Sequence, residues 1–452
     1  MPPGLDLWRL PFNHDSSCNS GFTKPIDFLA FDDRAWTFVD QASFTETVYD
    51  TGDWDAQRRT PSDHCPIVVG LDWPAVETRT GMPGAGSETA LAESALPRLS
   101  TYSKLDPDQV TVSGISSGGF FAHQFHVAYS DLVRGAAVMA GGPYACAEQI
   151  PTPLTGHPFA SIIVALGVCS HGARAIFDPW NLWLPASPSA QQSVAATMAE
   201  HAMGRIDDPS NLADDRVWLF AGGKDGVVPL SNVQTLESYY HSMGLSAPEL
   251  HLEYDANANH GVPIEDLTGT STYPDRDCDE YGLPFLIDCD YDGAERLLRH
   301  LYPQGFSAQP ATLDRNRLFE FDQSEFFSSA DPSVSMADAG YVYVPADCLE
   351  DAASPQGCRL HVAFHGCQQY TDLIGDDFYW DAGYNAWAEA NRIVVLYPQA
   401  TAWERPSDAT GFTANPKGCW DWWGYSGDNY YRQDGKQMQA VRAMIDRMLP
   451  DS

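Results

Sequence analysis

Residues 110–125 read VTVSGISSGGFFAHQF, which is a β-branched run, a turn of small residues and an apolar stretch that can continue as a helix. Within the turn, residues 114–118 (GISSG) match the pattern G-x-S-x-G. A serine hydroxyl becomes a useful nucleophile when a sharp strand-to-helix turn presents it clear of the backbone, and such a turn needs small flanking residues. The stretch therefore predicts Ser116 as a nucleophile. The alternative is a Gly/Ser-rich turn that only lets the helix pack closely on the strand.

A general base and its orienting carboxylate are expected at the carboxyl ends of later strands, in the chain order Ser, Asp, His. The run RVWLFAGG leads to Asp225, and the run LHLEYD leads to His260. Taken singly, Asp225 fits an ordinary turn residue and His260 a loop histidine. Their order and their placement favour a catalytic triad with Ser116. We interpret the other histidines considered, His123, His126, His241 and His251, as packing or surface residues.

Acyl transfer also needs hydrogen-bond donors for the developing oxyanion. The backbone N–H of Ser117, directly after the nucleophile, is one expected donor. The second usually comes from a loop upstream of the nucleophile, but here a His-Gly element, His365-Gly366-Cys367, follows the run LHVAF far downstream. This order is what a circular permutation would produce, because permutation preserves spatial contacts while it changes chain order.

Strand-like and helix-like stretches alternate along most of the chain. VTVSG, RVWLFAGG, LHVAFHG and IVVLYPQ are each followed by an amphipathic stretch. Such alternation predicts an α/β domain over residues 95–452, with a mostly parallel sheet and helices on both faces. Residues 75–94 have the small, polar, Gly-containing composition of a linker, which leaves residues 1–74 as a separate piece.

The composition restricts the partners of this 452-residue chain. Its 61 acidic and 26 basic side chains give a net charge of −35, which repels nucleic-acid phosphates and anionic membranes. Ten cysteines without a CxxC motif favour disulfides in an oxidising compartment over a metal site. The first residues, MPPGLDLWRLPFNHD, have neither the basic start nor the apolar run of a signal peptide, and we expect no membrane span elsewhere.

Residues 95–452 resemble the single-domain, circularly permuted poly(3-hydroxybutyrate) depolymerases of the fungal extracellular type. The stretches that carry the resemblance include VTVSGISSGGFFAHQFHVAYSD, CDYDGAERLL, GYVYVPADC, LHVAFHGCQQ, GYNAWAEANRIVVLYPQA and NPKGCWDWWGY. The stretch between Cys146 and Ala195 bears an insertion, and GGKD at Asp225 is more basic than the fungal pattern.

The resemblance implies a circularly permuted α/β-hydrolase fold and a secreted serine esterase that acts on a polyester. Ser116, Asp225 and His260 would form the triad, and the N–H groups of Ser117 and Cys367 would form the oxyanion hole. It also implies four disulfides: Cys146 with Cys169, Cys278 with Cys289, Cys348 with Cys358, and Cys367 with Cys419.

The resemblance places Trp420 in the lining of the substrate crevice, and we expect His365 to contact substrate as well. Trp420 belongs to a segment crowded with aromatic residues, of which we expect at most half to face the crevice or the polymer. The members of that segment are Trp420, Trp422, Trp423, Tyr425, Tyr430 and Tyr431. An aromatic-lined groove suits an apolar, uncharged, repeating ester better than a charged pocket does.

The N-terminal piece carries a different resemblance. KPIDFLAF and TPSDHCPIVVGLDW resemble the closing strands of the endonuclease/exonuclease/phosphatase family, with Asp63 and His64 at its terminal Asp-His pair. The upstream metal-binding Glu and Asn elements of that family have no counterpart here, so we do not expect metal-dependent phosphodiester cleavage. A surface turn in a small β-rich appendage explains these residues equally well. Cys18 and Cys65 are a further candidate disulfide.

These observations favour hydrolysis of poly(3-hydroxybutyrate) or its oligomers through an acyl-enzyme, by a monomer without cofactor or metal. Three alternatives stay open. One is a carbohydrate esterase of the same fold that removes acetyl or feruloyl groups. The others are a nuclease in the N-terminal piece and a polyester-binding module without catalysis.

Overall fold

The computed structural model describes residues 96–450 except 152–153, 155–159, 171–184, 186, 266–270, 272, 275, 351, 353–356 and 404–414. Nearer the N-terminus it describes the backbone of two antiparallel pairs of two-residue strands. They are β1 (Trp8–Arg9) with β2 (Ala30–Phe31) and β3 (Thr45–Glu46) with β4 (Ile67–Val68). The chain divides into two units, Met1–Ala90 and Leu91–Ser452. The expected linker at 75–94, the Asp63-His64 pair and the candidate disulfide Cys18–Cys65 lie outside the described residues.

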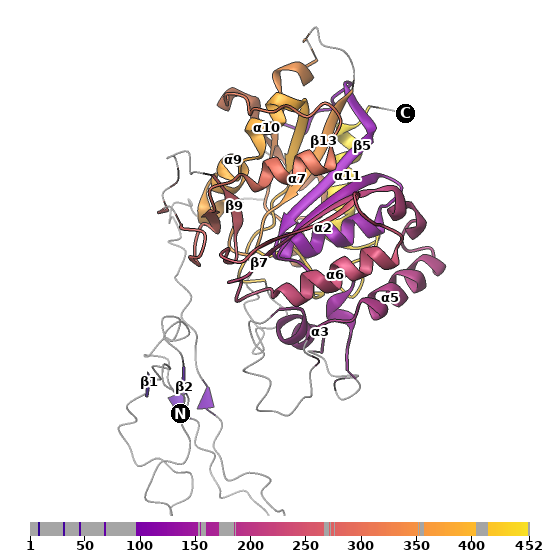
Figure 1. Ribbon diagram of the computed structural model, residues 1–452, viewed down its shortest axis with the longest axis vertical. Coiled ribbons are helices and arrows are strands. Elements are labelled where there is room, and N and C mark those ends of the chain that lie inside the picture. Colours follow the sequence, from indigo (N-terminus) through magenta and orange to yellow (C-terminus); the bar gives the residue numbers. More distant parts are fainter. Residues whose placement is uncertain are drawn as a thin grey trace, which may run out of the picture. The chain divides into compact units, whose positions relative to one another are not determined.

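An eight-stranded sheet forms the centre of the second unit (Figure 1). In spatial order its strands are β11 (Leu318–Asp322), β12 (Ala339–Tyr343), β14 (Ile393–Tyr397), β13 (Cys358–Phe364), β5 (Leu105–Ile115), β6 (Val133–Met139), β7 (Arg216–Gly222) and β8 (Leu250–Asp255). The six strands from β14 to β8 run parallel. At one edge β12 pairs antiparallel with β14, and β11 pairs antiparallel with β12. The predicted mostly parallel α/β sheet is confirmed.

Alternate residues of the central strands belong to two separate hydrophobic cores, one on each face of the sheet. In β14, Val394 and Leu396 pack into one core, whereas Ile393 and Val395 pack into the other. Every residue of this strand is buried. Such a sequence, apolar at every position, is expected where helices cover both faces.

Helices supply the outer layer of each core, as the sequence predicted. The first core includes residues of α2 (Ser117–Ala128), α6 (Leu230–Ser242) and α11 (Lys436–Met448). The second includes residues of α7 (Gly293–Leu301) and α10 (Tyr384–Asn391). Among the residues that the structure describes, no helix combines the length and the apolar character needed to cross a membrane.

Shorter elements connect these layers. They are α3 (Ala160–Val164), a π-helical turn (Ala165–Cys169), α5 (Ala190–Ala202), β9 (Val262–Ile264), β10 (Leu286–Asp288), α8 (Thr371–Ile374), α9 (Asp377–Asp381) and 3₁₀ turns at Cys146–Glu148, Pro209–Asp214, Arg315–Arg317, Ser324–Phe326, Pro332–Val334 and Ala346–Cys348.

All four disulfides that the resemblance implied are present, namely Cys146–Cys169, Cys278–Cys289, Cys348–Cys358 and Cys367–Cys419.

Candidate active site

Ser116 lies at the sharp turn between β5 and α2. Its φ of 55° and ψ of −122° lie in a backbone region that residues other than glycine rarely adopt. Residues in such strained conformations cluster at active sites, where surrounding contacts hold them in place. Two backbone hydrogen bonds hold the turn, from Ser116 N–H to Met139 O at 3.0 Å and from Phe120 N–H to Ser116 O at 2.9 Å. The turn therefore has the geometry expected of a nucleophile elbow.

The flanking glycines are required by close backbone approaches. A Cβ atom on Gly114 would lie 2.2 Å from Gly118 O, and a Cβ atom on Gly118 would lie 2.3 Å from His365 O. Side chains at either position would push the strand, the helix or the downstream loop apart. The small residues that suggested the elbow are thus explained by packing at this turn.

His260 and Asp225 form a hydrogen-bonded pair at the carboxyl ends of β8 and β7. The His260 Nδ1 atom lies 2.8 Å from Asp225 Oδ2, and both side chains are buried. The other carboxylate oxygen of Asp225 accepts hydrogen bonds from Val227 N–H and Val228 N–H, each at 2.8 Å. With its proton on Nδ1, the imidazole presents Nε2 as a free base. The pair has the arrangement of the base and orienting carboxylate of a triad.

The sheet brings the predicted residues to one edge. Because β5, β7, β8 and β13 run parallel, their carboxyl ends lie on the same side, and these ends are followed by Ser116, Asp225, His260 and His365. The contact between Ser116 Oγ and His260 Nε2 stays a prediction.

The loop after β13 lies directly against the elbow. A Cβ atom on Gly366 would be 3.4 Å from the Ser116 Cβ atom, so the backbone of this loop passes beside the nucleophile. Chain segments far apart in sequence therefore meet beside Ser116. Whether the N–H groups of Ser117 and Cys367 stabilise an oxyanion stays a prediction.

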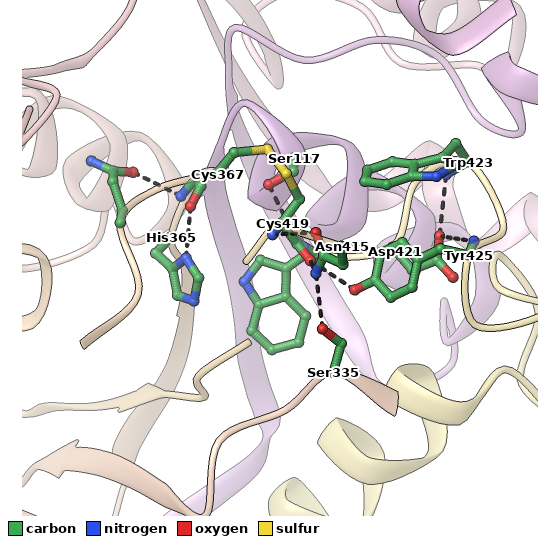
Figure 2. The surroundings of a disulfide bond; sticks show 12 residues. Ser117, Ser335, His365, Cys367, Asn415, Cys419, Asp421, Trp423 and Tyr425 are labelled. Atoms are coloured by element: carbon green, nitrogen blue, oxygen red, sulfur yellow. Dashed lines mark hydrogen bonds between the residues drawn. A yellow bond between two sulfur atoms is a disulfide. The ribbon is translucent and has the colours of Figure 1, made fainter. Parts of the chain in front are cut away.

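The Cys367–Cys419 disulfide and a backbone hydrogen bond from Gln368 N–H to Lys417 O at 2.7 Å tie the Cys367 loop to the segment that follows Asn415. Figure 2 shows the Cys367–Cys419 bond beside Ser117. Asn415 holds Cys419 on both sides, because its Oδ1 accepts from Cys419 N–H at 2.9 Å and its Nδ2 donates to Cys419 O at 2.7 Å. The N–H of Trp420 donates to Ser117 Oγ at 3.3 Å. The residues proposed for the oxyanion hole thus belong to one cross-linked unit.

His365 is completely buried and fully hydrogen bonded. Its Nδ1 donates to Gly366 O at 2.8 Å, and its Nε2 accepts from Ala400 N–H at 3.1 Å. Burial lowers the pKa of His365 to about 4, so the ring is neutral at pH 7. These contacts fit a ring that shapes the loop. Direct contact with substrate, which we expected, stays a prediction.

Trp420 is also completely buried, and its ring packs against Phe121, Phe364 and His365. Its expected place in the crevice lining therefore stays a prediction as well. Of the six aromatic residues in this segment, five are buried and Trp423 is partly exposed. Most of the segment is therefore buried, which is consistent with the expectation that at most half of its aromatic residues face the crevice or the polymer.

Asp421 shapes the aromatic loop that follows Trp420 (Figure 2). Its Oδ1 accepts from the N–H groups of Trp423, Gly424 and Tyr425 at 2.7–3.2 Å. Its Oδ2 accepts from Ser426 N–H and Oγ at 2.8 and 2.6 Å. The sequence interpretation missed this residue, although aspartate is common in turns because its side chain accepts hydrogen bonds from backbone N–H groups that follow it.

Among the described residues, one group of three possible metal ligands has its ligand atoms within 4.8 Å of one another. It consists of Asp255, Cys278 and Cys289. The two cysteines are joined in a disulfide. Metal ligation uses the thiolate, so this group does not constitute a metal centre.

Known depolymerases are similar to this chain over most of its length. No family model matches the chain. The poly(3-hydroxybutyrate) depolymerase of Delftia acidovorans is 36% identical over 366 residues, which cover 81% of this chain and 63% of that protein. The polyhydroxybutyrate depolymerase of Talaromyces funiculosus is 31% identical over 367 residues, which cover 79% of this chain and 94% of that protein.

A solved structure of a PHB depolymerase variant complexed with R3HB trimer superimposes with a TM-score of 0.64 at 28% identity. The match covers 78% of this chain and 98% of that one. The fold and the relatives together define a carboxylic ester hydrolase of the α/β class. The chain belongs to the polyhydroxybutyrate depolymerase family.

Proposed function

We propose that this protein hydrolyses the ester bonds of poly(3-hydroxybutyrate) or its oligomers. The observation that carries the proposal is the His260–Asp225 pair at the same sheet edge as the strained Ser116, with the Cys367 loop packed against that serine. The relatives are named for action on this polymer. Ester hydrolysis of such a polymer needs no cofactor when an activated serine is available.

In the proposed reaction, Ser116 Oγ attacks the ester carbonyl carbon while His260 Nε2 takes the hydroxyl proton. The carbonyl oxygen becomes negative and accepts hydrogen bonds from Ser117 N–H and Cys367 N–H. Collapse of this intermediate breaks the ester C–O bond, and His260 returns the proton to the departing alcohol. Water then attacks the acyl-serine by the same route and releases the acid, while Asp225 keeps the imidazole oriented.

The proposal includes a circular permutation. The oxyanion loop follows β13, yet β13 is the immediate neighbour of β5, which carries the nucleophile. An unpermuted chain would reach the oxyanion loop before the nucleophile. The order here fits a chain whose ends have been moved while the spatial neighbours are kept.

We further propose that the protein acts as a monomer outside the cell on polymer surfaces or soluble oligomers. Four disulfides in the described part of the chain support an oxidising environment. The net charge of −35 disfavours nucleic acid or anionic membranes as targets.

The test is incubation with amorphous and crystalline poly(3-hydroxybutyrate) while soluble 3-hydroxybutyrate products are measured. We expect release by the wild type, and no release by Ser116→Ala or after treatment with a serine-directed organophosphate. Release of acetate or ferulate from xylan without polymer degradation would instead indicate a carbohydrate esterase. Adsorption to the polymer without soluble product would indicate a binding module.

A further inference from the structure

Gln369 closes the turn that carries Cys367. Its backbone N–H donates to Gly366 O at 3.2 Å. Gln368, at the third position of the turn, has a φ of 63°. The Gln369 side chain, which is 2% exposed, folds back over the turn so that its Oε1 accepts from Gly366 N–H at 2.7 Å. One residue therefore holds both polar groups of Gly366.

These bonds fix the direction of the proposed oxyanion donor. Gly366 C=O and Cys367 N–H belong to the same trans peptide and point in opposite directions. The carbonyl is held by two donors, Gln369 N–H and His365 Nδ1–H. The Cys367 N–H must then point to the other side of the peptide. Gly366 N–H, the adjacent donor, is already occupied by Gln369 Oε1.

The other end of the same side chain reaches the segment beside the catalytic histidine. Gln369 Nε2 donates to Pro284 O at 2.9 Å and to Phe285 O at 3.3 Å. Phe285 O also accepts from Val262 N–H at 2.9 Å, two residues after His260. The rings of Phe285 and His260 lie in edge contact, with centroids 6.5 Å apart. A single buried amide thus joins the oxyanion loop to the packing around the base.

We infer that Gln369 is a positioning residue for catalysis, which holds the Cys367 N–H in register with His260. This inference rests on the proposed ester hydrolysis. Donors stabilise a developing oxyanion efficiently only when they are fixed before the reaction, because reorientation during the reaction costs free energy. Gln369 contacts no reacting atom, so its effect passes through Gly366 and Phe285.

Gln323 offers a matched control. It is also buried, and it makes the same three kinds of bond: Oε1 accepts from Gln399 N–H, and Nε2 donates to Ala337 O and Gln399 O. It lies at the end of β11, at the sheet edge farthest from β8. The variants Gln369→Met and Gln323→Met therefore remove equivalent buried hydrogen bonds, in one case directly on Gly366 and in the other on the Gln399 backbone, outside the turn that carries Cys367.

The experiment measures kcat and KM for p-nitrophenyl butyrate, together with urea unfolding, for the wild type and both full-length variants. We expect both variants to unfold at lower urea concentrations. Only Gln369→Met should lose kcat, by about 10-fold or more with little change in KM, since losing an oxyanion donor outright costs about 10²–10³. Equal kcat values in the two variants, or a change confined to KM, would overturn the inference. A wild type without esterase activity, or full activity in Ser116→Ala, would instead refute the proposed function.

Gln369→Glu provides the second variant if Gln369→Met does not fold. It keeps an acceptor for Gly366 N–H, but once ionised it has no proton to donate to Pro284 O and Phe285 O, so the bridge to the segment beside His260 is lost. We expect the ratio of variant to wild-type kcat to fall as the pH rises and this carboxyl group ionises. A ratio that does not vary with pH would contradict the positioning role.

Discussion

At the scale of single residues, the candidate site consists of polar groups whose hydrogen bonds are already made before any substrate binds. Asp225 makes three such bonds, one to His260 and two to backbone N–H groups. A carboxylate held this way orients the imidazole and stabilises its charged form, without itself taking the proton. In the proposed cycle the imidazole alone then carries protons, between the serine hydroxyl, the departing alcohol and the attacking water.

Replacing Asp225 by asparagine tests this role. The amide cannot accept from both His260 Nδ1–H and the two backbone donors, so the imidazole should adopt the wrong tautomer. We expect kcat to fall by about 10⁴, as in other triads, with the fold retained. Initial rates with p-nitrophenyl butyrate and circular dichroism measure both effects. A loss of less than tenfold would show that Asp225 does not orient the base.

His365 gives a prediction about pH and stability. Burial lowers its folded-state pKa to about 4, whereas an unfolded histidine titrates near 6.5. Between these values the unfolded chain binds the additional proton, so stability rises with pH across this window and falls as pH drops through it. The difference corresponds to up to about 3 kcal/mol.

The measurement is urea unfolding of the wild type and His365→Gln from pH 4 to pH 7.5. We expect the variant to be less stable at pH 7.5 and to depend less steeply on pH between about 4 and 6.5. If the free energy of unfolding depended on pH in the same way in both proteins, protonation of His365 would not contribute to the pH dependence of stability.

The site residues predicted from sequence are those whose proposed roles have a local signature. Ser116 was recognisable because its turn requires glycines next to it, and Asp225 and His260 because they follow β-runs in the expected order. Gln369 was missed, since a buried glutamine that bridges two loops has the same local sequence as one in solvent. The complete burial of Trp420 was not foreseen either, because it depends on Phe121 and Phe364 from distant elements.

At the scale of elements, a series of buried side-chain hydrogen bonds joins α2, which follows Ser116, to α6, which follows the Asp225 turn. His126 Nε2 lies 2.9 Å from Asp215 Oδ2, and its Nδ1 lies 2.9 Å from Tyr240 Oη. His123 Nδ1 lies 2.8 Å from the same Tyr240 oxygen. The interpretation of both histidines as packing residues is confirmed, and the chain of bonds adds a fixed polar link between the two helices.

Tyr240 is the centre of this link, since a single hydroxyl serves both histidines. Tyr240→Phe leaves two buried imidazole nitrogens without partners, which should lower the free energy of unfolding by about 2–4 kcal/mol. The neighbouring Tyr239→Phe removes a single bond, between Tyr239 Oη and Thr197 Oγ1, and should cost about 1 kcal/mol. Urea unfolding compares the two variants. Equal losses would mean that the histidine link contributes nothing beyond an ordinary buried hydroxyl.

At the scale of the whole molecule, the order of strands in the sheet explains how remote segments form one site. The β13 and β5 strands are neighbours, so the Cys367 loop and the Ser116 turn emerge side by side. The alternation of strand and helix patterns predicted the parallel sheet. The sequence pattern did not predict the antiparallel pair β11 and β12 at its edge, since short strands in mixed segments carry a weak periodic signal.

The net charge of −35 also acts on the whole molecule. Such self-repulsion destabilises a compact state and is screened by salt. Salt therefore stabilises the fold by screening this repulsion. Salt also weakens the ion pairs, but most of those described are at least partly exposed, where each contributes little to stability, so their loss should be smaller than the stabilisation. We expect the unfolding temperature to rise between about 0.01 M and 0.5 M NaCl, as the screening length shortens from roughly 30 Å to less than 10 Å. Differential scanning calorimetry measures this, and an unchanged or lower unfolding temperature would contradict it.

The central claim is that Ser116, His260 and two backbone N–H groups from opposite ends of the domain sequence converge on one ester carbonyl. A crystal structure of the protein after reaction with a p-nitrophenyl alkylphosphonate tests it most directly. We predict phosphorus bonded to Ser116 Oγ, with the phosphoryl oxygen about 2.7–3.1 Å from both Ser117 N and Cys367 N. A phosphonate attached to another residue, or an oxygen turned away from the Cys367 loop, would contradict the account.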